Sequence, residues 1–341
     1  MRHKDSGGSA NFQNAPPLDT LVQLGTKLAD KSPTAGEGGG TSTTIDAIRK
    51  RARAKYFSQN LAVRLASLPD SHLKKSYWNT FHCASDLTQK DKKLSSKYCG
   101  NRWCTVCNRI RTAKLINGYE KPLAAMTEKH FVTLTLPNVQ AEDLKATFET
   151  MLGHFKQIQE VFKKRKLRGK QDWQLVGIRK LECTYNPHSQ TYHPHFHALI
   201  EGKEAAEALV AEWLKRVPTA TSAAQDCRPA TVGAERELFK YFAKIVTKVG
   251  KDSKTLVKPL DVIFRAMWGL RVFQPIGIKK DVSEEIEELQ TLEVEDIEAE
   301  EETVFWRWER CDWVNHDTGE MLTGYEPSDA MNTLVSNMDT G

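Results

Sequence analysis

The chain lacks any long hydrophobic run. No stretch approaches the roughly 18 to 20 apolar residues that a membrane helix needs. Residues 1–40 also lack the apolar core of a signal peptide. Both absences argue against a membrane protein and a secreted one, so we expect a cytoplasmic protein. The apolar share of 40% in 341 residues is still enough to bury a core, in one large domain or two modest ones.

Acidic residues are scarce in most of the chain, and basic residues are scarce at its end. Residues 281–341 hold 19 acidic and two basic residues, whereas residues 1–280 hold 25 acidic and 47 basic ones. The first part therefore carries a net charge of +22, although the whole chain carries only +5. This asymmetry favours a polyanionic partner such as nucleic acid, although many enzymes also carry basic charge on a solvated face.

Composition divides the chain into four segments. Residues 1–44 are rich in Gly, Ser and Thr, and we expect them to be a disordered tail. Residues 45–125 form a helical and cysteine-rich region, and residues 126–280 alternate between strand-like and helix-like runs. Residues 281–341 are an acidic extension. Its first part is expected to be a solvated acidic helix or tail, with a DNA-mimicking strip that covers the basic face as the alternative.

Hydrophobic periodicity predicts an α+β fold. Amphipathic spacing indicates helices over residues 45–68, 141–166, 203–217 and 235–249. Alternating β-branched and apolar residues indicate strands over residues 130–139, 173–186 and 193–202. The last two strands are joined by the short polar link 187–192, as in an antiparallel hairpin. Strands with hairpin connections between helices favour an antiparallel sheet over a doubly wound parallel one.

Three histidines share one face of the second hairpin strand. They are His193, His195 and His197, since side chains two residues apart on a strand point the same way. The short link places Glu182 of the preceding strand across from them. Two imidazoles and a carboxylate can hold a divalent ion and leave positions open for a phosphate oxygen. We therefore predict a metal site at Glu182, His195 and His197, with His193 as a further candidate.

The helix predicted from residue 235 carries a charged stripe that includes a tyrosine. Its members follow at i, i+4, i+7 and i+11: Glu237, Tyr241, Lys244 and Lys248. A tyrosine at helical spacing is more often a packing residue, but this one is flanked by groups that a nucleophile would use. A phenol has a pKa of about 10, so its attack on a phosphodiester at neutral pH needs a nearby cation or metal.

Four cysteines crowd together near the start of the folded part: Cys83, Cys99, Cys104 and Cys107. The Cys-x-x-Cys pair is a common half-site for tetrahedral Zn²⁺, so we predict structural zinc over unmetallated thiols or redox use. His82 could replace Cys83 as a ligand. A basic knuckle that could grip DNA surrounds the cluster: Arg102, Arg109, Arg111 and Lys114. The other cysteines, Cys183, Cys227 and Cys311, have no partners at ligand spacing.

Three motifs in order carry a family resemblance: FVTLTLPN (131–138), LECTYN with YHPHFHALI (181–200), and ELFKYFAK (237–244). Over about residues 83–277 the chain resembles the initiator (Rep) proteins of rolling-circle plasmids in the HUH endonuclease superfamily. The resemblance implies a central antiparallel sheet with the histidines in its middle and the tyrosine helix beneath. It implies Mg²⁺ or Mn²⁺ on His195, His197 and Glu182, and Tyr241 as the nucleophile that becomes joined to a 5′ phosphate.

The resemblance also assigns the rest of the charged stripe. Glu237 stands where some relatives place a second tyrosine, and in single-tyrosine initiators a glutamate there activates water for the terminating cleavage. Lys244 is expected to stabilise the phenolate or the pentacovalent phosphate, or to clamp a phosphate, and Lys248 is expected to contact DNA. The implied partners are double-stranded and single-stranded plasmid origin DNA, with a host helicase and polymerase.

Three other functions are compatible with parts of this pattern. A relaxase usually has a third histidine ligand and an N-terminal tyrosine, and a related transposase often keeps two tyrosines. The relaxase arrangement does not occur in this sequence, and the position of a second tyrosine is taken by Glu237, which favours termination by water. A zinc-dependent DNA-binding regulator without catalysis is the remaining alternative. It is disfavoured because Glu182, His195, His197 and Tyr241 are all present.

Overall fold

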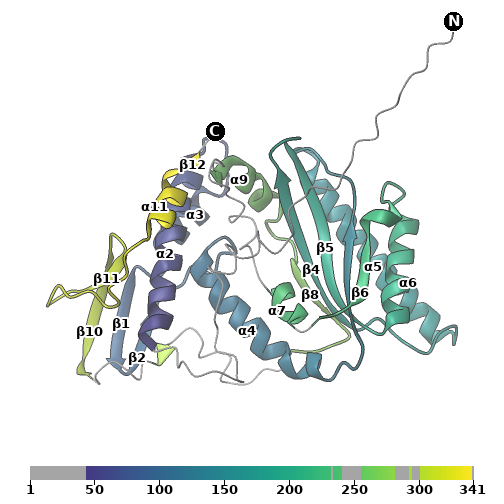
Figure 1. Ribbon diagram of the computed structural model, residues 1–341, viewed down its shortest axis with the longest axis horizontal. Helices are drawn as coiled ribbons and strands as arrows, with labels where there is room; N and C mark the ends of the chain where they lie inside the picture. Colours follow the sequence, from purple (N-terminus) through teal and green to yellow (C-terminus); the bar gives the residue numbers. More distant parts are fainter. Residues whose placement is uncertain (1–43, 232, 240–254, 281–291, 294–299, 340–341) are drawn as a thin grey trace, which may run out of the picture.

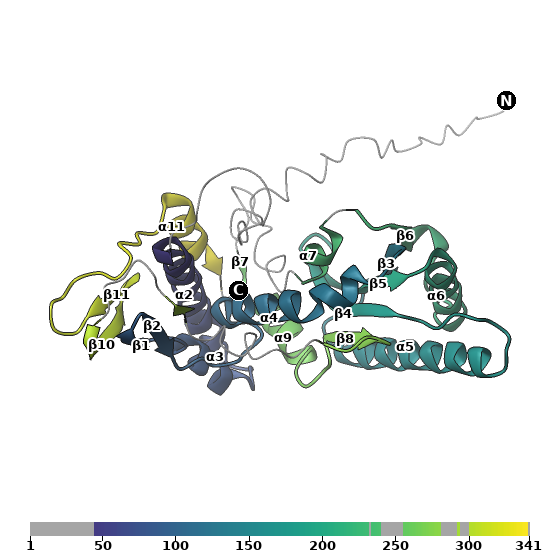
Figure 2. The ribbon, with the colours of Figure 1, turned by 90° about the horizontal axis from the view of Figure 1, so that it is seen from below.

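The computed structural model describes residues 44–231, 233–239, 255–280, 292–293 and 300–339. Two modules lie side by side along the longest axis of the molecule (Figures 1 and 2). One is built around a long helix and a small sheet, and the other around a larger sheet flanked by helices. Both modules mix helices with antiparallel strands, so the predicted α+β class is confirmed. Among the described residues, no helix is both long and apolar enough to cross a bilayer.

The larger sheet has five strands in the order β6-β3-β5-β4-β8, and every neighbouring pair is antiparallel. Its strands are β3 (Lys129–Thr135), β4 (Gly177–Asn186), β5 (Thr191–Glu201), β6 (Asp226–Pro229) and β8 (Phe273–Ile276). The hairpin predicted from the link 187–192 is β4–β5, and β5 is the middle strand of the sheet. The predicted histidine strand is therefore paired on both sides.

One close approach of backbones explains the glycine that begins β4. Gly177 has a φ of 152°, and a Cβ built on it would lie 2.0 Å from the carbonyl oxygen of Leu199 on β5. Any larger residue would push the two central strands apart at this point. The glycine therefore lets the hairpin strands stay in register over their full length.

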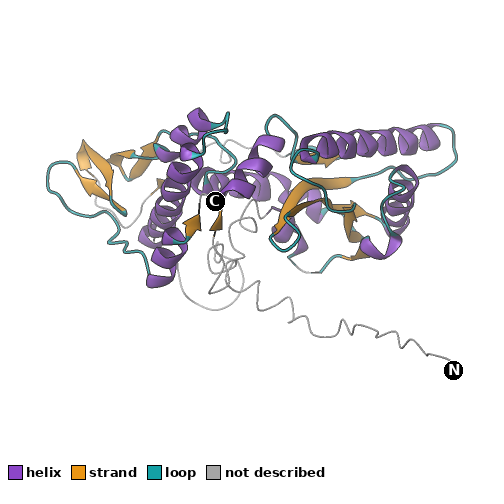
Figure 3. Cartoon of the chain, turned by 90° about the horizontal axis from the view of Figure 1, so that it is seen from above, coloured by secondary structure: helices purple, strands orange, loops and turns teal. Residues whose placement is uncertain are grey.

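Two helices cover one face of this sheet (Figure 3). They are α5 (Leu144–Leu167) and α6 (Lys203–Arg216). Phe155 and Trp213 of these helices pack edge-to-face on Phe196 of β5, and all three side chains are buried. The even-numbered side chains of β5 face this core, which leaves the histidines on the opposite face. That opposite face is covered by α4 (Thr105–Ala124) and α7 (Ala234–Phe239).

The second module joins segments from both ends of the described chain. Its sheet has the order β11-β10-β1-β2-β9. The strands are β1 (Asp86–Asp91), β2 (Lys93–Ser96), β9 (Leu292–Glu293), β10 (Glu300–Glu309) and β11 (Asp312–Asn315). Its helices are α2 (Thr44–Ser67), α3 (Lys74–Phe81) and α11 (Asp329–Ser336). Trp313 is fully buried, and its indole N–H donates to the carbonyl of Ala84 at 2.8 Å.

The remaining elements connect the two modules. They are β7 (Thr255–Leu256), α9 (Val257–Ala266) and β12 (Met338–Asp339), and β12 pairs in parallel with β7. Helix α9 contacts both α2 and α5, one in each module. The C-terminal segment therefore belongs to the same folded body as the cysteine-rich region. The four domain boundaries drawn from composition stay a prediction, and the expected tail up to residue 43 lies outside the described residues.

Candidate functional site

The central hairpin brings the predicted metal ligands face to face. Glu182 of β4 is directly opposite His195 of β5 in the strand register. One carboxylate oxygen, Oε2 of Glu182, lies 3.3 Å from Nε2 of His195 and 3.3 Å from Nε2 of His197. All three side chains lie on the sheet face opposite α5 and α6. The sequence therefore predicted both the members of this triad and their register.

Hydrogen bonds on the far side of each imidazole hold the two rings in place. Nδ1 of His195 donates to the carbonyl of His193 at 3.1 Å, and Nδ1 of His197 lies 3.1 Å from Oγ1 of Thr133 on β3. With Nδ1 engaged in this way, Nε2 of each ring faces the carboxylate oxygen. Two imidazole nitrogens and one carboxylate oxygen, all mutually within 4.8 Å, fit the donor set of a divalent ion.

A buried lysine orients the carboxylate. Lys180 is only 2% exposed, sits two residues before Glu182 on the same face of β4, and forms an ion pair with Oε1 of Glu182. The carboxylate is thus divided: Oε1 is held by Lys180, and Oε2 faces the histidines. Burial alone would raise the pKa of Glu182, but Lys180 and the two histidines outweigh it and hold that pKa well below its usual range. Glu182 is therefore a ready anionic ligand at neutral pH.

Two histidines of this face, His193 and His197, have lowered pKa values. Burial lowers the pKa of His197 below its usual value, against the opposing hydrogen bond and charge of Glu182. Burial and the neighbouring histidines also lower the pKa of His193. A neutral imidazole has a lone pair to give to a metal, whereas an imidazolium does not.

The structure places His193 beside the triad rather than in it. Its Nε2 lies 3.0 Å from Oγ1 of Thr135, and its Nδ1 lies 2.9 Å from Oδ1 of Asn138. Its ring stacks on that of His195, with ring centres 5.2 Å apart. With both nitrogens engaged, His193 is placed to support His195. Its assignment as a fourth ligand stays a prediction.

The predicted tyrosine helix begins on the same face of the sheet as the triad. Leu238 and Phe239 of α7 are buried against Ile178 of β4 and Leu199 of β5, which share their strand faces with Glu182 and the histidines. Glu237 lies on α7, and its side chain is outside the described part of the structure. The other residues predicted for this stripe, Tyr241, Lys244 and Lys248, also lie outside the described residues.

The four predicted zinc ligands form a second cluster in the other module. The Sγ atom of Cys107 lies 3.5 Å from that of Cys83 and 3.6 Å from that of Cys99. Together with Cys104, the four sulfur atoms lie within 4.8 Å of one another, and none forms a disulfide. Backbone N–H groups of Cys99 and Gly100 point at Sγ of Cys83 and Cys107, at 3.4 Å and 3.3 Å. This donor set fits a tetrahedral zinc site.

The cluster is assembled from a hairpin and a helix start. Cys83 precedes β1, Cys99 follows β2, and Cys104 is the N-cap of α4. The alternative ligand His82 is exposed and packs its ring on Phe81, so the structure brings Cys83 into the cluster instead.

The predicted basic knuckle lies around this cluster and along α4. Arg111 donates to the carbonyl of Gly100 at 2.6 Å, and Arg102 donates to the carbonyl of Met267 at 3.4 Å. Arg109 is exposed on α4, and Lys114 is half-buried one turn further along. Arg111 and Arg102 fasten the knuckle to its neighbours. A DNA-binding role for all four stays a prediction.

Comparison with known proteins gives this arrangement a family context. Residues 90–204 match the family model described as Replication protein. The predicted resemblance to Rep proteins is confirmed over this segment. The match contains Glu182, His195 and His197, so the triad lies within the part of the chain that this family shares.

Individual relatives agree with the family match. A "Protein rep" of Staphylococcus aureus is 32% identical over 130 residues, which cover 36% of this chain and 54% of that protein. A "Protein rep" of Streptococcus pneumoniae is 30% identical over 115 residues, 32% of this chain and 34% of that protein. A "Protein rep" of Bacillus amyloliquefaciens is 28% identical over 164 residues, 46% of this chain and 44% of that protein. The chain thus spans about a third to a half of these relatives. No solved structure matches it.

The structure adds residues that the sequence did not single out. Lys180, Thr133, Thr135 and Asn138 hold the triad or its neighbour His193. A signal was present for each: Lys180 is two residues from Glu182 on one strand, and the two threonines alternate on the strand that precedes Asn138. What the sequence lacked was the pairing of β3 with β5, which places Thr133 opposite His197 and Thr135 opposite His195.

Proposed function

We propose that this chain is a rolling-circle plasmid replication initiator that nicks one strand of its origin through a tyrosine. The observation that carries the proposal is the Glu182, His195 and His197 triad, inside the segment that matches replication proteins. It lies on the sheet face against which the start of the tyrosine helix packs. The proposal covers the activity, the metal and the partners.

The triad is the site for Mg²⁺ or Mn²⁺. Oε2 of Glu182 and Nε2 of each histidine supply three ligands, so coordination positions stay open toward the DNA. A divalent ion bound there supplies Lewis-acid polarisation of the scissile phosphate. Lys180 holds the other carboxylate oxygen and so fixes the direction of Oε2. This arrangement keeps Glu182 a one-oxygen ligand.

Tyr241 is the nucleophile in this proposal. Its phenolate oxygen attacks the phosphorus, the bond from phosphorus to the 3′ oxygen breaks, and that oxygen leaves and takes up a proton. The chain is then joined to the 5′ phosphate, and the free 3′ hydroxyl primes a host polymerase while a host helicase opens the duplex. Lys244 follows Tyr241 by three residues, one turn along the helix predicted from the sequence, and stabilises the negative charge that develops on phosphorus.

Glu237 ends the cycle. It lies four residues before Tyr241, which is one helical turn, so its carboxylate can take a proton from a water molecule aligned on the phosphotyrosyl bond. Attack by that water breaks the bond between phosphorus and the tyrosine oxygen and releases the protein. One covalent strand transfer followed by hydrolysis is the expected course.

The second module serves DNA binding and stability. Zinc on Cys83, Cys99, Cys104 and Cys107 fixes the start of α4, from which Arg109, Arg111 and Lys114 meet origin DNA, double-stranded and then single-stranded, together with Arg102. Lys248 extends this contact from the tyrosine helix. The cytoplasm, where the plasmid, helicase and polymerase meet, is the proposed location.

The decisive experiment mixes purified protein and Mn²⁺ with a supercoiled plasmid that carries its own gene and flanks. A covalent protein–DNA adduct is sought on a denaturing gel and its peptide is mapped. Tyr241→Phe should abolish the adduct. Tyr185→Phe, which removes another half-buried phenol on β4, is the matched control and should keep it.

A metal chelator should abolish the adduct in every variant. An adduct that persists in Tyr241→Phe would remove Tyr241 from its assigned role. Origin binding without cleavage in any divalent metal would instead support a non-catalytic DNA-binding regulator.

A further inference from the structure

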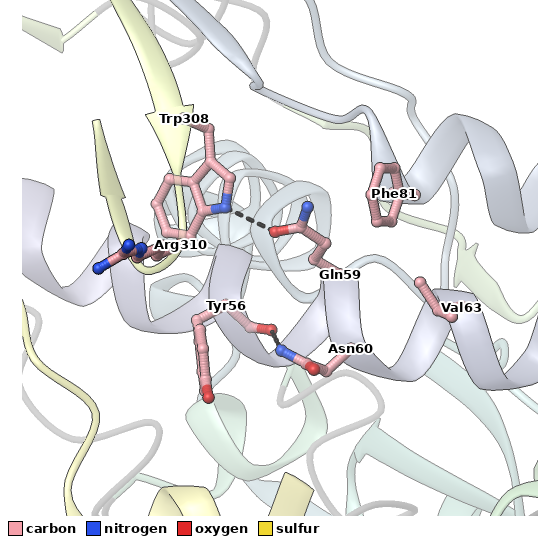
Figure 4. A pocket seen from close by; sticks show the side chains of 7 residues that line it. All are labelled: Tyr56, Gln59, Asn60, Val63, Phe81, Trp308 and Arg310. Atoms are coloured by element: carbon pink, nitrogen blue, oxygen red, sulfur yellow. Dashed lines mark hydrogen bonds between the residues drawn. The ribbon is translucent and has the colours of Figure 1, made fainter. Parts of the chain in front are cut away.

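A pocket of about 300 Å³ opens on the module that carries the cysteine cluster (Figure 4). It lies between α2, the end of α3 and β10 with the turn that follows. Seven side chains line it: Tyr56, Gln59, Asn60, Val63, Phe81, Trp308 and Arg310. None of the assigned roles uses this pocket.

Contacts within the protein hold its walls in place. The indole N–H of Trp308 donates to Oε1 of Gln59 at 2.5 Å (Figure 4). Nζ of the buried Lys55 lies 5.5 Å from the centre of the Trp308 ring and donates to the carbonyl of Phe81 at 2.9 Å. A single lysine thus ties together the wall from β10 and the wall from α3. The pocket is preformed rather than dependent on a ligand.

The chemistry of the lining fits a nucleobase. Three aromatic rings, those of Tyr56, Phe81 and Trp308, offer stacking or edge contacts. Oε1 of Gln59 accepts from Trp308 and Nδ2 of Asn60 donates to the carbonyl of Tyr56, so Gln59 offers its amide N–H groups and Asn60 its amide oxygen to a base edge. Arg310 lies at the pocket as the guanidinium that a phosphate would need. Among the described residues no carboxylate lines the pocket, which matters because a carboxylate would repel a phosphodiester.

The surroundings extend this surface. Trp78 of α3 is 46% exposed and packs edge-to-face on Phe81, with ring centres 5.5 Å apart. Lys74 and Lys75 are exposed one turn earlier on the same helix. Residues 44–114 hold 16 basic and four acidic residues, a net charge of +12. An exposed aromatic beside lysines, on a strongly basic segment, is the pattern of a surface that follows single-stranded nucleic acid.

We propose that this pocket takes one unpaired base of single-stranded DNA, with Arg310 on the adjoining phosphate and Trp78 on the next base. The inference rests on the proposed function for its partner, DNA, but it uses neither the triad nor Tyr241. In a duplex the base faces are stacked, so a pocket walled by aromatic rings selects an opened strand. The protein would thereby hold the strand exposed at its origin at a second place.

The test is equilibrium binding of a fluorescein-labelled oligothymidylate by the full chain in a buffer without added Mg²⁺, Mn²⁺ or chelator, so that cleavage is not supported and zinc is not removed. Val63→Glu puts a carboxylate into the pocket at a position that is 40% exposed, so the fold should tolerate it. We expect binding to weaken about tenfold. Arg310→Gln should weaken it as well and lower the salt slope of log K by about 0.7, the effect of one lost phosphate contact on a single strand.

Ala47→Glu is the matched control. It adds the same charge at an exposed position of α2 outside the pocket, and binding should change less than twofold. An abasic oligomer, which keeps the phosphates and lacks the bases, should bind the unaltered protein about tenfold more weakly than oligothymidylate. Equal binding of the two oligomers would overturn the proposal.

Two further outcomes separate this proposal from the proposed function. If Val63→Glu loses duplex and single-stranded binding equally, the pocket reads no unpaired base and the proposal fails. If Tyr241→Phe still forms the adduct or the wild type does not nick, the proposed function fails, but the pocket measurements keep their meaning because they require no cleavage.

Discussion

The two candidate metal sites of this molecule differ in how completely the protein surrounds them. The cysteine cluster offers four thiols from a hairpin and a helix start, and it leaves no position for a substrate. The triad offers two imidazoles and a carboxylate from two strands, and it leaves the rest of the coordination sphere open. Closed sites of the first kind stabilise a fold, whereas open sites bind and polarise a substrate.

The supports of the two sites differ in the same way. Backbone N–H groups point at the sulfur atoms of the cluster, so its geometry depends on how the chain is folded there. The triad is held mainly by other side chains, namely Lys180, Thr133 and the stacked ring of His193, together with one backbone carbonyl that accepts from His195. A substitution near the triad can therefore change its chemistry while the fold persists. We therefore expect that disrupting the cysteine cluster affects the stability of the fold, whereas disrupting the triad affects its chemistry.

The largest effect is expected from opening the closed site. Cys104→Ser should lower the free energy of unfolding of the second module, which carries the cysteine cluster, by on the order of 5 kcal/mol or more. This is part of the roughly 10 kcal/mol that structural zinc can contribute. Calorimetry should show this module unfolding at a lower temperature than the larger sheet. Cys227→Ser, at a half-buried cysteine outside the cluster, should leave the zinc content unchanged. Full zinc content in Cys104→Ser would contradict the assignment.

The next effect is on catalysis alone. His197→Ala should lower the nicking rate by about a thousandfold, since several kcal/mol of transition-state stabilisation depend on the metal. Zinc content and thermal unfolding of the cysteine-rich module should stay as in the wild type. His188→Ala, at the exposed hairpin turn, is the control. A variant that loses zinc together with nicking would show that the two sites are not independent.

A third prediction concerns the strand that closes the N-terminal module. Trp313→Ala should destabilise the protein by about 3 to 5 kcal/mol, because a fully buried indole and its hydrogen bond to Ala84 are lost. Chemical denaturation measures the change. Trp268→Ala removes an indole that is 52% exposed and should cost far less. If Trp313→Ala lost as little stability as Trp268→Ala, the C-terminal hairpin would contribute little to the fold.

The smallest effect separates orientation from coordination at the triad. Lys180→Met should weaken Mn²⁺ binding by about 10- to 100-fold, the usual cost of removing a group that orients a metal ligand. Calorimetric titration against pH provides the sharper readout. The pKa of Glu182 is depressed in the folded protein. Glu182 therefore stays anionic even at its usual pKa of about 4.3, and it takes up a proton only when the pH falls to the depressed value.

Without Lys180, burial should move the Glu182 pKa upward, and Mn²⁺ binding should fail at a higher pH than in the wild type. Lys180→Arg should restore part of the affinity, and Lys170→Met, at an exposed position, should change nothing. An unshifted pH profile in Lys180→Met would limit Lys180 to a packing role.

Local patterns in the sequence were sufficient for most of the module that carries the triad and for the long helix of the other module. The helices α2, α5 and α6 and the strands β3, β4 and β5 lie where periodicity predicted them. Glu182 meets His195 because a short link fixes the register of a hairpin. The Cys-x-x-Cys spacing predicted a shared site for the four cysteines, and the structure brings their sulfur atoms together.

Nonlocal pairings were beyond reach. Nothing in the sequence indicated that residues 300–307 pair with residues 86–91, since alternation along a strand does not identify its partner. The same limit hid Thr133, which meets His197 only because β3 pairs with β5. The run 257–277 divides into α9 and β8 for a similar reason, because its second part becomes the edge strand beside β4.

The pairing of β1 with β10 can form only late in the synthesis of the chain. Leu87 is aligned with Trp306, so the partner of β1 is made more than two hundred residues after it. At the roughly 5 to 20 residues per second of a ribosome, β1 waits on the order of 10 to 40 s for that partner. During this interval the surface of this module that later packs against Trp313 is exposed to solvent. We expect ribosome-bound chains that end before residue 300 to be cleaved by protease near β1, and longer chains to resist.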